Sequence, residues 1–151
     1  VVIFGAGPIG LMLMILGKKF YGVDKIIIVE PSESRRNMAL DLGADIVIDP
    51  TVQDPVAMVM NTTDNQGAQA IFTACPVIET HKQAIKMVAK RGVVNFFGGV
   101  PKDEPEISLL SNFIHYREAY ITGSHGSIHK QHKTDLNLIA NKSVDISRLE
   151  S

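Results

Sequence analysis

The sequence predicts an α/β protein with a six-stranded, doubly wound parallel sheet that carries helices on both faces. Two observations support this fold class. Short apolar runs alternate with longer segments of helical period through most of the 151 residues. The apolar runs are hydrophobic at consecutive positions, which is typical of strands whose two faces are both covered. One domain accounts for this length, and we assign residues 1–151 to it.

The predicted strands cover residues 1–4, 26–29, 45–48, 69–73, 93–97 and 119–122. Helices are predicted over residues 8–20, 33–42, 55–61, 77–90 and 127–140, and residues 109–116 form a short helix or an irregular segment. Ser127 is the expected cap of the last helix.

Capping residues mark several of these helix ends. Ser32 is the expected N-cap of the second helix, and Gly43 its C-terminal stop. The pair Asp54-Pro55 is typical of a helix start. The two basic residues before Gly92 predict that the fourth helix extends to residue 90.

Composition excludes several classes of function. The chain carries 15 basic and 16 acidic residues, so we expect no nucleic-acid partner and no anionic membrane partner. The apolar run at residues 9–16 is too short to cross a bilayer. Cys75 is the only cysteine, which excludes an intrachain disulfide and a cysteine-rich structural zinc site. These features are typical of a cytoplasmic protein.

A glycine-rich loop follows the first predicted strand and opens the first helix. Gly5, Gly7 and Gly10 form a G-x-G-x-x-G motif, in which Pro8 and Ile9 begin the helix. Gly5 would permit a tight turn, and Gly10 would let the helix lie close to the strand. Gly7 would let the backbone approach a pyrophosphate, held at the helix N-terminus by free N–H groups and the helix dipole. This context predicts the dinucleotide site of a Rossmann fold.

Glu30 ends the second predicted strand, 20 residues after Gly10. A carboxylate there accepts hydrogen bonds from the adenosine ribose hydroxyls and repels a 2′-phosphate, so we predict NAD rather than NADP. Arg35 and Arg36 follow closely, and an arginine in this region can also bind a phosphate. With Glu30 present, we interpret Arg35 as a ribose or pyrophosphate partner.

The sequence resembles the cofactor domain of zinc-type medium-chain alcohol dehydrogenases, and most of all the sorbitol and threonine dehydrogenase branch. The resemblance covers nearly the whole chain. It is carried by residues 2–12, 29–31, 35, 39, 42–45, 98–101, 112–118 and 123–124.

The resemblance implies further cofactor contacts beyond the carboxyl ends of the strands. Pro31 would lie against the adenine. Ala74 and Cys75 would line the ribose and nicotinamide side. The backbone near the carboxamide would come from two segments, and its residues are Gly98, Gly99, Val100, Gly123 and Ser124.

The resemblance also implies the activity of a longer protein. The chain opens inside an apolar run without an initiator methionine, so we expect it to be a fragment. In the family, a preceding domain holds the catalytic zinc, and the complete enzyme transfers a hydride between a polyol or secondary alcohol and NAD. We assign no catalytic and no metal-binding residue to this chain. The parent protein would be a homo-oligomer, a dimer or tetramer, that pairs the edge strand at residues 119–122.

Other interpretations of the same residues remain open. The chain could be a nucleotide-binding module that regulates or senses without chemistry. A methyltransferase also has a glycine-rich first loop and an acid after the second strand, but residues 98–101 and 123–124 argue against that class. Cys75 could be a reactive thiol, although a half-buried residue at a strand end is the simpler interpretation. The spacing of His125, His129 and His132 would suit a metal, or a polar loop and a solvated helix start.

Overall fold

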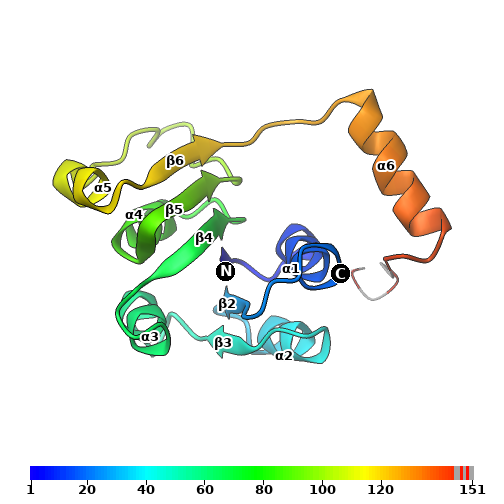
Figure 1. Cartoon of the computed structure of the whole chain (residues 1–151), viewed down its shortest axis with the longest axis horizontal. Coiled ribbons are helices and arrows are strands. Elements are labelled where there is room, and N and C mark those ends of the chain that lie inside the picture. The colour runs from blue at the N-terminus through cyan, green and yellow to red at the C-terminus, as the bar shows by residue number, and fades with distance from the viewer. Residues whose placement is uncertain (145–146, 148, 150–151) are drawn as a thin grey trace.

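The computed structural model describes residues 1–144, 147 and 149. Among these residues, six parallel strands form one sheet in the order β3-β2-β1-β4-β5-β6 (Figure 1). The strands are β1 (Val2–Phe4), β2 (Ile27–Val29), β3 (Ile46–Ile48), β4 (Ala68–Thr73), β5 (Val88–Phe96) and β6 (Tyr120–Gly123). The doubly wound parallel sheet predicted from the sequence is therefore confirmed. Its direction of winding reverses at β1, which pairs with β2 on one side and β4 on the other.

Helices cover both faces of the sheet, as the continuous apolar strands predict (Figure 1). They are α1 (Pro8–Phe20), α2 (Glu33–Asp41), α3 (Pro55–Thr62), α4 (Ile78–Lys86), α5 (Ser111–Arg117) and α6 (His129–Ala140). Because side chains alternate along a strand, Ile3 packs with α1 and α2, whereas Val2 and Phe4 pack with α3 and α4. No helix in the described part of the chain is long and apolar enough to cross a membrane.

Two of the predicted helix ends have the expected local chemistry. The Asp54 carboxylate accepts hydrogen bonds from the N–H groups of Val56 and Ala57, at 2.9 and 3.4 Å. Gly43 lies just beyond α2 with φ +109°, a conformation that favours glycine. Ser32 is the N-cap residue of α2 by position, but its hydroxyl lies 3.0 Å from the Ser34 hydroxyl and does not cap the helix.

The prediction of a helix over residues 77–90 is wrong at the C-terminal end of that range. α4 ends at Lys86, and Val88 already pairs with Ala68 of β4. Met87 and Val88 are fully buried in the core, so burial overrides the helical pattern. Arg91 has φ +60°, and the register of β5 against β4 shifts nearby, so the basic pair before Gly92 marks an irregularity within a strand. The strand predicted over residues 93–97 is wrong at its start, because β5 already begins at Val88. The remaining predicted boundaries lie within two residues of those observed.

The C-terminal helix stands apart from the sheet. α6 follows an extended connection after β6 (Figure 1), and nearly all of its residues are exposed. Its N-cap position is Ile128, whose N–H donates to the Gln131 side chain at 2.8 Å. The prediction that Ser127 caps this helix is therefore wrong, because the Ser127 hydroxyl bonds instead to His132 Nε2 at 2.9 Å.

Candidate functional site

A hollow of about 390 Å³ lies at the carboxyl ends of the strands, at the point where the sheet reverses its winding. Ligands of open α/β sheets bind at this place. Its lining comes from the segments after β1, β2, β3 and β4, and from α4. The lining residues are Phe4, Gly5, Val29, Glu30, Pro31, Arg35, Pro50, Cys75, Val77, Glu79, Thr80 and Gln83.

The glycine loop has the geometry that the motif predicts. Gly5 has φ +98°, and a β-carbon on Gly10 would lie 2.0 Å from the Gly5 carbonyl oxygen. Both positions are therefore restricted to glycine by the chain itself. Gly7 differs, because a β-carbon there would meet no described atom within 4 Å. Packing within the described chain gives no reason for glycine at that position, whereas close approach of a ligand to the backbone would.

The N-terminus of α1 opens directly from this loop. Gly7 is the N-cap residue and Pro8 occupies the first turn. No side chain caps the helix, so no side-chain oxygen competes for the N–H groups at its positive end. An anion placed above Gly7 would meet these donors.

The Glu30 carboxylate is buried, with only 4% of the residue exposed, and it braces the glycine loop. Oε2 accepts a hydrogen bond from the Ala6 N–H at 2.8 Å, and Oε1 accepts one from the Ser32 N–H at 3.0 Å. A carboxylate has about four acceptor positions, so about two remain for a ligand. The sequence indicated a ligand-binding carboxylate at Glu30, but not that the same group ties β2 to the loop.

The two arginines of α2 have different environments. Arg35 is exposed, lines the hollow, and makes no hydrogen bond or ion pair with the part of the chain that the structure describes. Arg36 is turned away and donates to the carbonyl oxygens of Glu30 and Pro31 at 2.8 and 2.7 Å. Its Nη2 also lies 2.9 Å from Asp49 Oδ2. Adjacent helical residues point in different directions, so only one arginine can face the hollow.

The end of β4 meets the glycine loop, and the turn after β5 meets the end of β4. The Ala74 N–H donates to the Phe4 carbonyl at 2.9 Å, and the Gly98 N–H donates to the Thr73 carbonyl at 2.6 Å. A β-carbon on Gly98 would lie 2.8 Å from the Cys75 carbonyl oxygen, so the turn after β5 packs closely on the end of β4. Cys75 is half-buried in the lining, with its Sγ 3.7 Å from Thr80 Oγ1.

A buried histidine contacts the turn that follows β5. His81 of α4 stacks on Phe96 with ring centroids 4.2 Å apart, and its Nε2 lies 3.1 Å from Thr73 Oγ1. Burial lowers the pKa of His81, while a hydrogen bond with the Gly98 backbone opposes that shift. His81 lies on the apolar face of the amphipathic helix α4, a signal in the sequence from which its burial could have been predicted.

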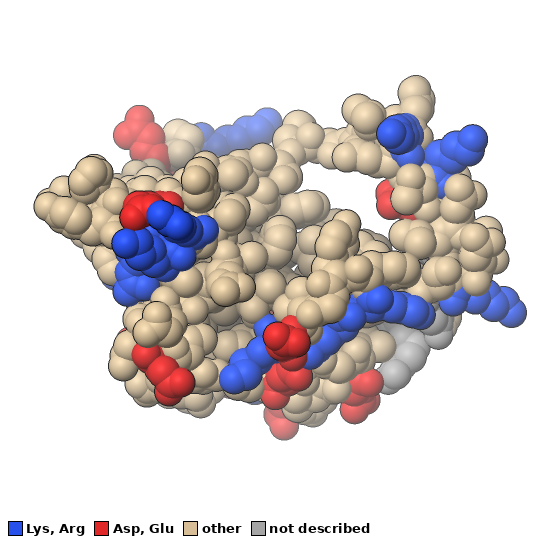
Figure 2. Space-filling view, in the orientation of Figure 1, with Lys and Arg blue, Asp and Glu red and all other residues tan. Residues whose placement is uncertain are grey.

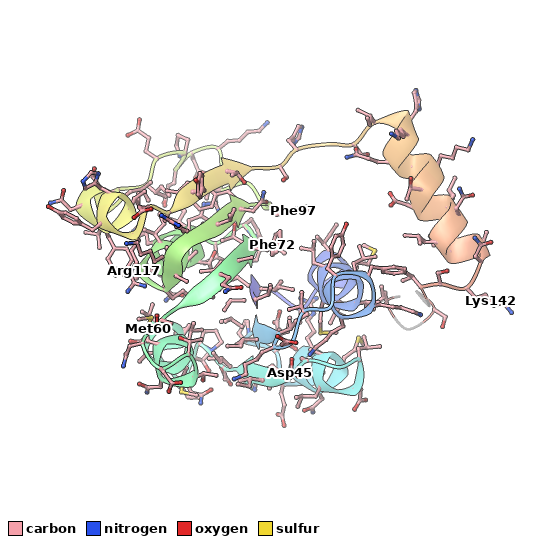
Figure 3. All side chains as sticks on the ribbon, in the orientation of Figure 1. Asp45, Met60, Phe72, Phe97, Arg117 and Lys142 are labelled. Carbon is pink, nitrogen blue, oxygen red and sulfur yellow. The ribbon has the colours of Figure 1, made fainter. Side chains whose placement is uncertain are left out.

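The remaining predicted residues lie further along the same edge of the sheet. Gly99 and Val100 follow Gly98, Gly123 ends β6, and Ser124 follows it. Asn95 Nδ2 donates to Ser124 Oγ at 2.9 Å and to Thr122 Oγ1 at 2.9 Å. Ser124 lines a second hollow of about 600 Å³ together with His125, Gln131 and Phe97. Figure 3 shows Phe97 just beyond the end of β5. The structure therefore places Gly123 and Ser124 beside the first hollow rather than in its lining.

The surface charge is consistent with the nearly equal numbers of basic and acidic residues in the sequence. On the face shown in Figure 2, Lys and Arg side chains are interspersed with Asp and Glu.

Among the described residues, no group of three or more His, Cys, Asp and Glu side chains is placed to hold a metal ion. The structure as described therefore does not bring His125, His129 and His132 together as a set of metal ligands. His132 instead bonds to Ser127.

Comparisons with known proteins agree on one family. Residues 8–141 match the family model described as zinc-binding dehydrogenase. Scyllo-inosose 3-dehydrogenase of Thermotoga maritima is 39% identical over 136 residues, which are 89% of this chain and 34% of that protein. L-threonine 3-dehydrogenase of Thermococcus kodakarensis is 33% identical over 126 residues, which are 83% of this chain and 35% of that protein. The chain thus spans about a third of the length of these relatives.

Solved structures extend the agreement to the fold. Benzyl alcohol dehydrogenase of Acinetobacter calcoaceticus superposes with a TM-score of 0.89 at 28% identity, over 98% of this chain and 41% of that one. A zinc-binding dehydrogenase of Sinorhizobium meliloti 1021, solved bound to NADP, has a TM-score of 0.90 at 26% identity, over 97% of this chain and 43% of that one.

We expect Gly10→Ala to destabilise the protein and Gly7→Ala to leave its stability unchanged or slightly raised. The new β-carbon at Gly10 would collide with a backbone oxygen, which cannot move aside as a side chain can. The cost should be about 3 kcal/mol, the upper end for overpacking. Gly7 has φ −72° and open space around it, so alanine is tolerated there. Urea unfolding measures both variants, and equal losses would contradict the assigned geometry.

Proposed function

The chain belongs to the zinc-binding dehydrogenase family, and we propose that it is the NAD-binding part of a zinc-dependent oxidoreductase. The proposed reaction is hydride transfer between a polyol or secondary alcohol and NAD. The observation that carries the proposal is the glycine loop, where open space above Gly7 faces an uncapped helix N-terminus beside the buried Glu30 carboxylate. The names of the relatives support an alcohol or polyol substrate, which would bind to the parent protein.

We assign the nucleotide to the hollow and the loops that border it. The pyrophosphate would lie over Gly7, Pro8, Ile9 and Gly10, where the first-turn N–H groups favour negative charge. The adenosine ribose would bond to the remaining acceptor positions of Glu30, with Pro31 against the adenine and Arg35 near the ribose or pyrophosphate. The nicotinamide half would extend toward the ends of β4, β5 and β6. Its proposed contacts are Ala74, Cys75, Gly98, Gly99, Val100, Gly123 and Ser124.

Specificity for NAD rests on the charge of Glu30. Its two acceptor bonds to Ala6 and Ser32 fix the carboxylate at the end of β2, where a 2′-phosphate would lie close to it. Two like charges at this separation repel. The Sinorhizobium meliloti structure, which is 26% identical, holds NADP, so resemblance in fold alone does not decide the cofactor of this chain. For this chain the buried carboxylate favours NAD.

In the proposed mechanism, the residues of this chain bind and orient rather than react. The nicotinamide cofactor would supply the hydride acceptor. The buried Glu30 side chain bonds to the glycine loop, which would hold the adenosine half of the cofactor. The buried His81 side chain bonds to the turn after β5, which would hold the nicotinamide half. The described residues do not fit a zinc site, so we place zinc in the parent protein, outside this chain.

We also place the parent protein in the cytoplasm, because the single cysteine of this chain is typical of proteins in reducing compartments.

We further propose that the parent protein is a homo-oligomer that pairs the exposed edge of β6. Tyr120 on this strand is 62% exposed, and β6 has a partner on one side only within the described sheet. Backbone pairing of two copies would satisfy the free groups of the edge. Ultracentrifugation of the full-length protein at micromolar concentration should show a dimer or tetramer, and a monomer alone would contradict the proposal.

Replacing Glu30 by alanine should shift the preference between NADH and NADPH by at least about tenfold. The variant loses charge-assisted hydrogen bonds to the ribose and the repulsion of a 2′-phosphate. It should also lower the melting temperature, because the Ala6 N–H loses its acceptor. Titration of both nucleotides against the wild type and the variant measures the shift. An unchanged ratio of affinities would refute the assigned role, whatever happens to stability.

The chain alone should bind NADH, hold no stoichiometric zinc and oxidise no alcohol. The contacts at Gly7 and Glu30 are local to the first part of the chain. A catalytic zinc needs about three protein ligands, and the sequence offers one cysteine and five histidines, of which His125, His129 and His132 lie in one short segment. Calorimetry with NADH, metal analysis after dialysis, and assays with sorbitol, threonine and simple secondary alcohols test this. One zinc per chain with measurable turnover would overturn it, and failure to bind NADH would overturn the proposed function.

A further inference from the structure

Asp49, which directly follows β3, forms an ion pair that holds the Arg36 side chain in place. Arg36 Nη1 donates to the carbonyl oxygens of Glu30 and Pro31, at 2.8 and 2.7 Å. Its Nη2 lies 2.9 Å from Asp49 Oδ2, and the side chains of this pair are only 14% and 20% exposed. The planar guanidinium thus joins the ends of β2 and β3.

Asp49 is itself held in a fixed orientation. Its Oδ1 accepts hydrogen bonds from the Thr51 N–H and hydroxyl at 2.9 and 2.6 Å, which leaves Oδ2 directed at Arg36. The hydrogen bonds from Thr51 and, after them, the charge of Arg36 lower the pKa of the Asp49 carboxyl. Asp49 is therefore ionised at neutral pH and neutralises Arg36.

The ion pair lies directly behind the wall of the hollow. Arg36 bonds to the carbonyls of Glu30 and Pro31, which both line the hollow, and Asp49 precedes Pro50, which lines it as well. An arginine next to this wall with free donors and an uncompensated charge would attract a 2′-phosphate. Here all three observed contacts of the guanidinium go to the protein.

We propose that Asp49 is a specificity-determining residue for the cofactor, because it holds Arg36 away from the position of a 2′-phosphate. Asp49 thus acts through Arg36, whereas Glu30 acts on the nucleotide directly. Arg36 is a positioning residue, since it fixes the backbone that carries the Glu30 carboxylate. This inference rests on the proposed function, in which the hollow takes a nicotinamide dinucleotide.

The test is Asp49→Asn in this chain, titrated with NADH and with NADPH. Asparagine keeps an acceptor for Thr51 but removes the charge that compensates Arg36. The ratio of the NADPH to the NADH dissociation constant should fall about fivefold, mainly through tighter binding of NADPH. Asp24→Asn is the matched control, because it removes the same charge beside a separate hollow lined by Val1, Tyr21 and Thr63. Its ratio should equal that of the wild type.

A double variant separates specificity from a purely structural effect. In Arg36→Gln/Asp49→Asn the gain in NADPH affinity should be lost, because the residue through which Asp49 acts is gone. A structural role alone would lower the melting temperature and weaken both nucleotides equally. Asp49→Ser is the second variant if Asp49→Asn does not unfold cooperatively, since serine also offers Thr51 an acceptor.

Four outcomes would overturn a claim. A ratio within about twofold of the wild type in a folded Asp49 variant would refute the inference. So would a double variant that keeps the gain in NADPH binding. If the wild-type chain binds neither nucleotide, the proposed function is wrong. If Glu30→Ala shifts the ratio while Asp49→Asn does not, only the role of Asp49 is wrong.

Discussion

The bond between the Glu30 carboxylate and the Ala6 N–H is the interaction on which the candidate site depends. It joins the end of β2 to the loop between β1 and α1, and it occurs where the residue is almost fully buried. A buried carboxylate without partners would be costly, so its position requires both the Ala6 and Ser32 donors. The loop, in turn, can pass this close to β2 because Gly5 adopts φ +98°. Loop conformation and carboxylate position therefore determine each other.

Much of this could be predicted from the sequence, because the relevant signals are local. Apolar runs, the Asp54-Pro55 start and the spacing of Gly5, Gly7 and Gly10 each act within a few residues. The fold class and the position of the glycine loop follow from them, and the structure confirms both. The functional roles of the site residues remain proposals.

Contacts between segments distant in sequence could not be predicted. Lys86 ends α4 early because Met87 and Val88 are drawn into the core against β4, which no helical period reveals. Arg35 and Arg36 are identical in type, and the contact of Arg36 with Asp49 on another strand end could not be predicted from the sequence. The helical spacing of His81 with Ala84 and Ile85 could have predicted its burial, but not its partners Thr73 and Phe96, which lie on two different strands.

The two halves of the candidate site differ in how far the described chain completes them. On the adenosine side, Glu30 and Arg36 are each bonded to the backbone of the same wall, so the described residues fix its shape before a ligand arrives. On the nicotinamide side, Gly99, Gly123 and Ser124 are exposed, and the buried Asn95 Oδ1 has no hydrogen-bond partner among the described residues. A preformed wall costs little ordering entropy on binding, whereas an exposed one leaves the nicotinamide ring open to water. Affinity in this chain should therefore come mainly from the adenosine half, and orientation of the nicotinamide should depend on what covers the ends of β5 and β6.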